Sequence, residues 1–137
     1  MSRTLGIDYG ERRVGLAISD SMGIIAKPLT TLTNTANGSW WAALDEIIED
    51  REVDTLVVGY PLNMKGQSTK QTEVVDHFIT ELGGRTGLPV ERYDERLTSV
   101  AAKKSLIMQG VKTGHEKGRI DQTAAALLLQ DYLDSRR

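Results

Sequence analysis

Three acidic residues stand at positions where a carboxylate has no obvious structural purpose. Asp8 ends a short apolar run at residues 5–7, Glu95 follows a later predicted strand, and Asp121 opens the last apolar segment. Strand interiors disfavour Asp, and a buried carboxylate without a partner is energetically costly. Each of the three acids therefore calls for an explanation, and chemistry at a shared site is one.

A shared site would suit metal-dependent hydrolysis. Functional groups gather where the carboxyl ends of parallel strands meet, so Asp8 and Glu95 would converge if their strands are parallel neighbours. Asp121, in the first turn of a helix, could point into the same crevice. Three adjacent carboxylates repel one another unless a divalent cation neutralises them, and oxygen ligands favour Mg²⁺ or Mn²⁺. Such ions can activate water for phosphodiester cleavage.

Each acid also has a purely structural interpretation. Asp8 could cap the turn that follows it or pair with an arginine in that turn. Glu95 could pair with Arg96 or Arg92, and Asp121 could simply be an acid favoured by the helix dipole. Spacing alone leaves both interpretations open.

Basic residues offer candidate contacts to a phosphate backbone. The net charge of −2 does not indicate a polyanionic partner, but residues 103–119 carry five Lys or Arg against one acid. Such a run can bind phosphates, or it can be a solvated helix face. The loop after residue 60 could contact substrate, or it could only connect a strand to a helix. The candidate contacts are Arg12, Arg13, Asn63, Lys65, Arg96, Lys103, Lys104, Lys112, Lys117 and Arg119.

The hydrophobic pattern predicts the elements that must position these residues. We expect strands at about 5–8, 14–18, 24–32, 55–58 and 89–93, and helices at about 40–50, 68–82, 98–109 and 120–133. In this scheme Gly83 and Gly84 end the second helix. The order predicts an α/β fold whose mixed five-stranded sheet begins as an antiparallel meander, continues with parallel strands and carries helices on both faces.

Composition restricts the class of protein. The length of 137 residues suits a single domain spanning 1–137, and the absence of cysteine favours a reducing cytoplasm. We expect no membrane span, because no apolar stretch approaches the necessary length. Trp40 lies on the apolar stripe of its helix and is expected in the core, whereas Trp41 could be either core or a platform for stacking a base.

Four motifs together resemble one bacterial family. They are LGIDYGERRVGLAISD, VVGYPLNMKG, DERLTS and RIDQTAAALLLQDYLD, which span residues 5–134 in order. They resemble the YqgF family, also called RuvX, of the RNase H-like superfamily, which is related to the Holliday-junction resolvase RuvC. The resemblance implies an RNase H-like fold and a Mg²⁺- or Mn²⁺-dependent nuclease site at Asp8, Glu95 and Asp121. RuvC-type sites often carry a further acid where this chain has Gly118.

The resemblance leads to a ranked set of functions. We expect a metal-dependent endonuclease acting on structured nucleic acid, with the 5′ end of the 16S ribosomal RNA precursor as substrate and a monomer or weak homodimer as the active form. The first alternative is a resolvase of four-way DNA junctions. The second is a non-catalytic nucleic-acid-binding module in transcription or ribosome assembly. An ATPase of the sugar-kinase and actin type ranks last, because it needs two such domains.

Overall fold

The computed structural model describes residues 3–35, 37–97 and 117–136. Its elements are, in chain order, β1 (Arg3–Tyr9), β2 (Arg13–Ser19), β3 (Ala26–Thr33), α1 (Trp40–Asp50), β4 (Val53–Tyr60), α2 (Lys70–Thr86), β5 (Val90–Asp94), the 3₁₀ turn η1 (Glu95–Leu97) and α4 (Lys117–Ser135). The helix expected at about 98–109 lies outside the described residues.

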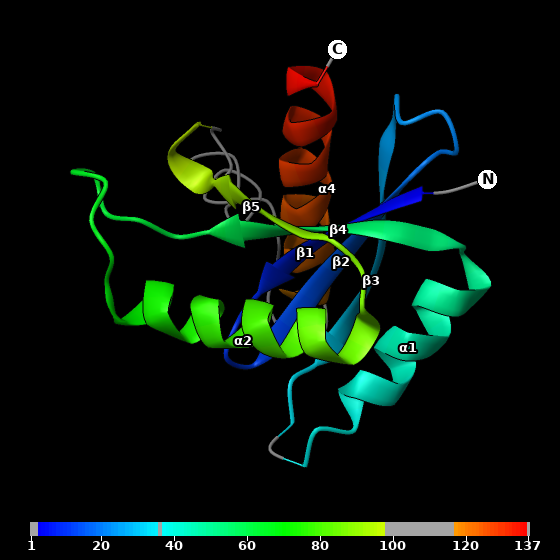
Figure 1. Cartoon of the computed structure of the whole chain (residues 1–137), viewed down its shortest axis with the longest axis horizontal. Helices are drawn as coiled ribbons and strands as arrows, with labels where there is room; N and C mark the ends of the chain where they lie inside the picture. Colours follow the sequence, from blue (N-terminus) through cyan, green and yellow to red (C-terminus); the bar gives the residue numbers. More distant parts are fainter. Residues whose placement is uncertain (1–2, 36, 98–116, 137) are drawn as a thin grey trace.

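The strands form one mixed sheet in the order β3-β2-β1-β4-β5 (Figure 1). β1 pairs antiparallel with β2, which pairs antiparallel with β3. On the other side β1 pairs parallel with β4, and β4 pairs parallel with β5. The predicted meander followed by parallel strands is therefore confirmed, and β1 is the central strand.

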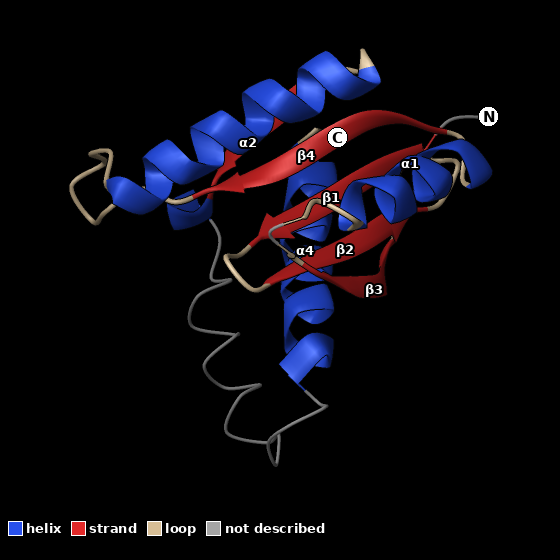
Figure 2. Ribbon diagram, turned by 90° about the horizontal axis from the view of Figure 1, so that it is seen from below, coloured by secondary structure: helices blue, strands red, loops and turns tan. Residues whose placement is uncertain are grey.

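The two faces of the sheet are covered by different helices. Alternate residues of a strand point to opposite faces. Leu5 and Ile7 of β1 pack in one cluster with side chains of α1 and α2, whereas Ala17 and Val57 pack in another with Ala125 of α4. Figure 2 shows α4 crossing the face opposite to α1 and α2. Helices on both faces, as predicted, leave the strand ends as the place where side chains can reach a substrate.

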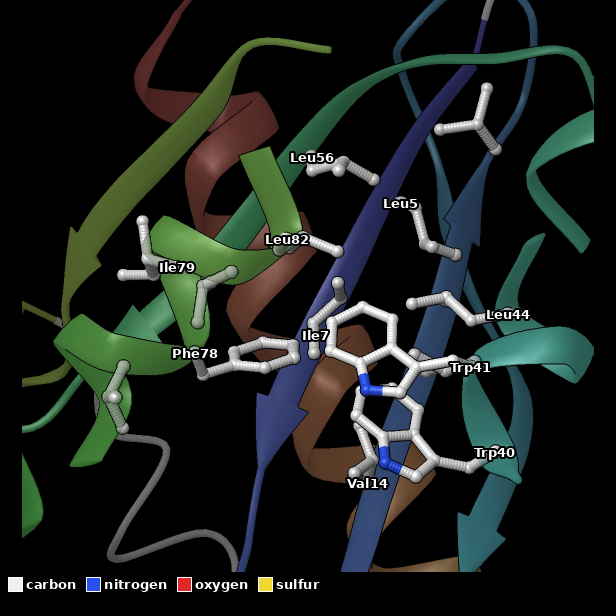
Figure 3. Packing of buried hydrophobic residues seen from close by; sticks show 14 of the residues in the cluster. Leu5, Ile7, Val14, Trp40, Trp41, Leu44, Leu56, Phe78, Ile79 and Leu82 are labelled. Carbon is white, nitrogen blue, oxygen red and sulfur yellow. The ribbon is translucent and has the colours of Figure 1, made fainter. Parts of the chain in front are cut away.

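Both tryptophans belong to the core beneath α1 and α2. Trp40 and Trp41 are 5% and 7% exposed, their ring centroids are 4.3 Å apart, and both rings lie near Phe78 (Figure 3). Rings packed in this way cannot stack on a base. The expectation for Trp40 is confirmed, and the open question about Trp41 is decided in favour of the core.

Helix α2 ends later than its glycine pair predicted. Both Gly83 and Gly84 lie inside the helix, and the chain leaves it at Gly87, whose φ of +68° is left-handed. Glycine adopts that conformation without a steric penalty, so Gly87 is the true C-terminal signal. The helix begins after Thr69, which forms a capping box with Thr72. The loop from β4 to α2 is therefore fixed at its far end.

The boundaries of the other elements differ slightly from the prediction. β3 begins at Ala26 rather than at residue 24, because the backbone N–H groups of Ile24 and Ile25 donate to the Asp20 carboxylate in the turn before it. β4 is longer than the apolar run at residues 55–58, extending from Val53 to Tyr60. Within the described part of the chain, no helix is long and apolar enough to cross a membrane.

Candidate active site

The three predicted acids line a single pocket at one end of the sheet. Its volume is about 230 Å³. Asp8 comes from the end of β1, Glu95 from the first position of η1 after β5, and Asp121 from α4. The complete lining is Asp8, Tyr9, Gly10, Gly59, Pro61, Gln71, Val75, Glu95 and Asp121. Residues separated by as many as 113 positions thus reach one concave surface.

A glycine in β2 allows α4 to approach the strand that carries Asp8. Asp8 is paired with Gly15 in the sheet register. A Cβ atom built on Gly15 would lie 2.2 Å from the backbone carbonyl oxygen of Asp121, far closer than real Cβ atoms come. The missing side chain at Gly15 therefore allows Asp121 to sit over the strand beside Asp8.

A second glycine makes room for Glu95. A Cβ atom on Gly59, near the end of β4, would lie 2.6 Å from Oε1 of Glu95. The parallel pairing of Gly59 with Tyr93 brings the end of β5 next to this point, so η1 starts directly beside it. The absence of a side chain on the neighbouring strand lets the Glu95 carboxylate lie over the sheet edge.

The neighbouring acid, Asp94, has a different role. Its carboxylate accepts hydrogen bonds from Nε and Nη2 of Arg96, the latter at 2.7 Å, and from the Arg96 backbone N–H. The Arg96 guanidinium holds the pKa of Asp94 below its usual value. Arg92 pairs with Asp76. The two arginines considered as partners for Glu95 are thus bonded to other carboxylates.

Asp121 is the most enclosed of the three acids. It is 8% exposed, and Nε of Arg13 donates to its Oδ2 at 2.5 Å. The prediction that Asp121 lies in the first turn of its helix is wrong, because α4 extends back to Lys117 and its described first turn contains no acid. Since the helix dipole acts only within that turn, it does not explain this buried acid.

The pocket lining offers three carboxylates as possible metal ligands. Among the described residues, no group of three or more His, Cys, Asp or Glu side chains is arranged so that it could hold an ion. In this arrangement the Asp121 carboxylate is bound to Arg13. The chemistry of the lining nevertheless suits a hard divalent cation, because three carboxylates supply only oxygen donors and their mutual repulsion would be relieved.

Some of the predicted phosphate contacts are exposed, and others are already bonded within the protein. Arg12 is exposed in the turn between β1 and β2, whereas Arg13 is engaged with Asp121. Lys65 is exposed in the loop after β4. The Asn63 carboxamide is used inside that loop, where its Oδ1 accepts from the backbone N–H groups of Lys65 and Gln67. Asn63 therefore shapes the loop.

The remaining basic candidates are described only in part. Arg96 pairs with Asp94, and its guanidinium lies against Gly66 of the β4–α2 loop, within 3.3 Å of the position a Cβ would take there. The other five candidates are not described at the level of their side chains. Lys103, Lys104 and Lys112 lie outside the described residues, and Lys117 and Arg119 belong to the first turn of α4.

The pocket includes residues that sequence reasoning missed. Gln71 and Val75 face it from α2, and Pro61 faces it from the loop that precedes α2. The substrate contacts predicted in the same loop were Asn63 and Lys65. Helical spacing could have identified Gln71 and Val75 as a pair, because positions i and i+4 share one helix face.

Known proteins resemble this chain over nearly its whole length. A protein of Chloroflexus aurantiacus described as "Putative pre-16S rRNA nuclease" is 47% identical over 133 residues, covering 97% of this chain and 87% of that protein. A Roseiflexus protein with the same description is 40% identical, covering 98% of this chain and 96% of that protein.

Solved structures share the fold. RuvC of T. thermophilus in complex with a Holliday junction substrate has a TM-score of 0.60 at 17% identity, covering 99% of this chain and 96% of that one. The fowlpox virus Holliday junction resolvase has a TM-score of 0.54 at 11% identity, covering 97% and 99%. The fold is therefore that of the RuvC-like, RNase H-type resolvases. The family model RuvX, described as Holliday junction resolvase, matches residues 2–135, so this chain belongs to the RuvX family.

Proposed function

We propose that this protein is a divalent-metal-dependent endonuclease whose substrate is structured RNA, namely the 5′ end of the 16S ribosomal RNA precursor. The observation that carries the proposal is the convergence of Asp8, Glu95 and Asp121 on one pocket. The description of the curated relatives as nucleases of pre-16S rRNA favours RNA as the substrate. A cytoplasmic location belongs to the same proposal.

The three carboxylates would hold Mg²⁺ or Mn²⁺. A bound ion of this kind supplies an activated water and stabilises charge on the leaving oxygen. The chain contributes the placement of the acids, because Gly15 and Gly59 leave the space in which Asp121 and Glu95 lie. Tyr9, Pro61 and Val75 also line the pocket.

Basic side chains would bind the backbone on either side of the cleavage point. Arg12 and Arg13 lie at the turn next to Asp8, Lys65 is exposed in the β4–α2 loop, and the Arg96 guanidinium lies beside Gly66 of that loop. Lys103, Lys104, Lys112, Lys117 and Arg119 complete the proposed contacts. Phosphate contacts of this kind position the substrate without reading its sequence.

Replacement of Asp8 by Asn tests the proposal. The variant keeps the shape of the side chain but removes a charged oxygen ligand, so cleavage of a pre-16S RNA substrate should fall at least about a hundredfold. Folding should be nearly unchanged, because the pocket leaves Asp8 partly exposed. Calorimetry with Mn²⁺ should show weaker binding in the variant, which gives a readout independent of turnover.

Asp45→Asn is the matched control, because Asp45 is exposed on α1 and does not line the pocket. It should cleave and bind Mn²⁺ as the unmodified protein does. Unchanged turnover in Asp8→Asn would refute the catalytic assignment. Salt-dependent RNA binding without any Mn²⁺ heat would instead favour a non-catalytic binding module.

A four-way DNA junction is the second candidate substrate. It is supported by the family description and by the fold shared with RuvC, whose solved complex contains such a junction. The chemistry at the three acids would be the same with either substrate. Only the shape of the nucleic acid and the assembly state of the protein would differ.

A further inference from the structure

A second polar pocket lies at the opposite end of the central strand from the acids. Its volume is about 250 Å³, and its lining is Arg3, Ile18, Ser19, Asp20, Ile25, Lys27 and Arg51. Arg3 begins β1, whereas Asp8 is near its end, so the two pockets are separated by about 17 Å along a strand that rises roughly 3.3 Å per residue. In Figure 1 this is the end of β1 next to the label N.

Three separate elements bring cations to this pocket. Arg3 comes from β1, and Lys27 is paired with Ile18 across β2 and β3. Arg51 follows the last residue of α1, and the bond from the Arg3 backbone N–H to the Glu52 carbonyl ties this turn to the start of β1. The convergence is therefore built by the sheet and its connection to α1.

The three cations of this pocket differ in their pairing from other arginines of the molecule. Across residues 3–35, 37–97 and 117–136, no side chain of Arg3, Lys27 or Arg51 forms an ion pair. By contrast, Arg85, Arg92 and Arg136 each pair with a carboxylate.

One acid does line the pocket. Asp20 accepts hydrogen bonds from the backbone N–H groups of Ile24 and Ile25, and these bonds hold its pKa below the usual value, so it is ionised. Its Oδ1 is used by the turn that starts β3. The lining thus carries three positive charges against one negative charge, on a chain whose net charge is −2.

We propose that this second pocket binds a phosphate group. A net positive lining that gathers two guanidinium groups and an ammonium matches an oxyanion with more than one charge, because arginine donates in a planar fork and lysine as a point charge. The phosphate could belong to a polynucleotide backbone or to a small phosphorylated ligand. The site goes beyond the proposed nuclease function, because none of its residues lines the acid pocket.

The test compares two triple variants with equal loss of charge. One changes the pocket (Arg3→Gln, Lys27→Gln, Arg51→Gln), and the control changes the paired arginines (Arg85→Gln, Arg92→Gln, Arg136→Gln). Both are made in the Asp8→Asn background and are measured with EDTA, so that neither cleavage nor metal bridging contributes. Thermal unfolding confirms that each variant is folded. The probes are inorganic pyrophosphate, by calorimetry, and a labelled structured RNA, by anisotropy at several salt concentrations.

The pocket variant should bind pyrophosphate about tenfold more weakly, as expected when charged hydrogen bonds are removed. If the phosphate belongs to RNA, the slope of log affinity against log salt should also fall by about 0.7 to 0.9, the value for one neutralised phosphate. Loss of pyrophosphate binding with an unchanged RNA slope supports the pocket and identifies a small phosphorylated ligand.

Equal behaviour of the pocket variant and the control, or of the pocket variant and the Asp8→Asn parent, would overturn the proposal. Failure here leaves the nuclease proposal standing, because cleavage is tested separately through Asp8. Conversely, a protein that cleaves no RNA could still bind pyrophosphate at this pocket. The two proposals therefore fail independently.

Discussion

At the scale of single residues, the ion pair between Arg13 and Asp121 places a positive charge beside one acid of the candidate active site. The Asp121 side chain is 11% exposed and that of Arg13 is 38% exposed, so one partner is enclosed and the other reaches solvent. The guanidinium supplies a positive charge to a carboxylate that a divalent cation would also bind. We therefore expect Arg13 and a bound cation to compete for Asp121.

Arg13→Gln should lower the unfolding temperature in EDTA. Because Arg13 is more than a third exposed and its attraction is screened, we expect a loss of about 1 kcal/mol, or about 3 °C for a chain of this length. Added Mn²⁺ should raise the unfolding temperature of the variant more than that of the unmodified protein, since the ion would replace the lost positive charge.

The control for this experiment is Arg85→Gln, which breaks an exposed pair with Glu81 on α2. That variant should respond to Mn²⁺ as the unmodified protein does. Thermal unfolding followed by circular dichroism measures both variants. An equal Mn²⁺ response in Arg13→Gln and in the unmodified protein would show that Arg13 and the ion do not share Asp121.

Tyr132 should make stability depend on pH in the alkaline range. Burial, and then its hydrogen bond to Glu91, raise its pKa from 10 to about 12. Below pH 10 the phenol is protonated in both the folded and the unfolded chain, so its contribution is fully present. Between pH 10 and about pH 12 the unfolded chain ionises first, and this contribution is lost.

Tyr132→Phe removes the ionisable group and tests this assignment. The difference in unfolding free energy between the unmodified protein and the variant should decrease as the pH rises through that window. Urea unfolding at several pH values measures it. A difference that stays constant from pH 10 to pH 12 would contradict the raised pKa.

At the scale of elements, the spacing between β2 and α4 determines whether the acids can meet. Gly15 lies under the backbone of Asp121, and Gly6 of β1 lies under Leu129. A Cβ atom built on Gly6 would lie 2.8 Å from the Cβ atom of Leu129. Both glycines lie beneath α4. Their missing side chains let the helix approach the sheet closely, which puts Asp121 within the pocket that Asp8 lines.

Gly15→Ala should therefore destabilise the protein and disturb the site together. The new methyl group would meet backbone atoms that cannot rotate away, so we expect a loss of at least about 2 kcal/mol, in the range of overpacked cores. Chemical denaturation measures the stability, and Mn²⁺ calorimetry measures the site.

Gly84→Ala is the control of opposite sign. Gly84 is exposed inside α2 and has no atom within 4 Å of the position of its Cβ, so alanine should stabilise the helix by about 0.5 to 1 kcal/mol. If Gly15→Ala were as well tolerated, the position of α4 would not depend on its close packing against β2 at Gly15.

At the scale of the whole molecule, β1 connects two pockets of different charge. The acids lie where β1 and β4 end, and the cations of the second pocket lie where β1 begins. The central strand thus separates a site suited to metal chemistry from one suited to phosphate.

The assembly state should separate the two candidate substrates. A resolvase cuts two symmetric strands of a junction and is expected to act as a twofold dimer. If the RNA precursor is the substrate, the protein should cleave a pre-16S RNA as a monomer or weak homodimer and leave a matched four-way junction intact. Light scattering combined with both cleavage assays measures this. A stable dimer that cleaves the junction in preference to RNA would reverse the assignment.

The order and type of the described strands and helices and the mixed sheet could be predicted from the sequence, which also singled out three acids as candidates for one site. These follow from local signals, because strand and helix periodicity and the position of an acid at a strand end are written in neighbouring residues. Four motifs spread over the chain added the family. The predicted end of α2 at Gly83 and Gly84 was wrong, since a helix tolerates glycine where its packing is favourable.

The contacts between side chains that are distant in the sequence depend on the tertiary packing. Arg13 and Asp121 are 108 residues apart, and their contact depends on how closely α4 packs on β2 at Gly15. The burial of Trp41 depends in the same way on the meeting of α1 with α2. The basic pocket also required the structure, because Arg3, Lys27 and Arg51 share no motif and meet only when the sheet and α1 are assembled. Such contacts arise from packing between distant segments, which no local pattern in the chain encodes.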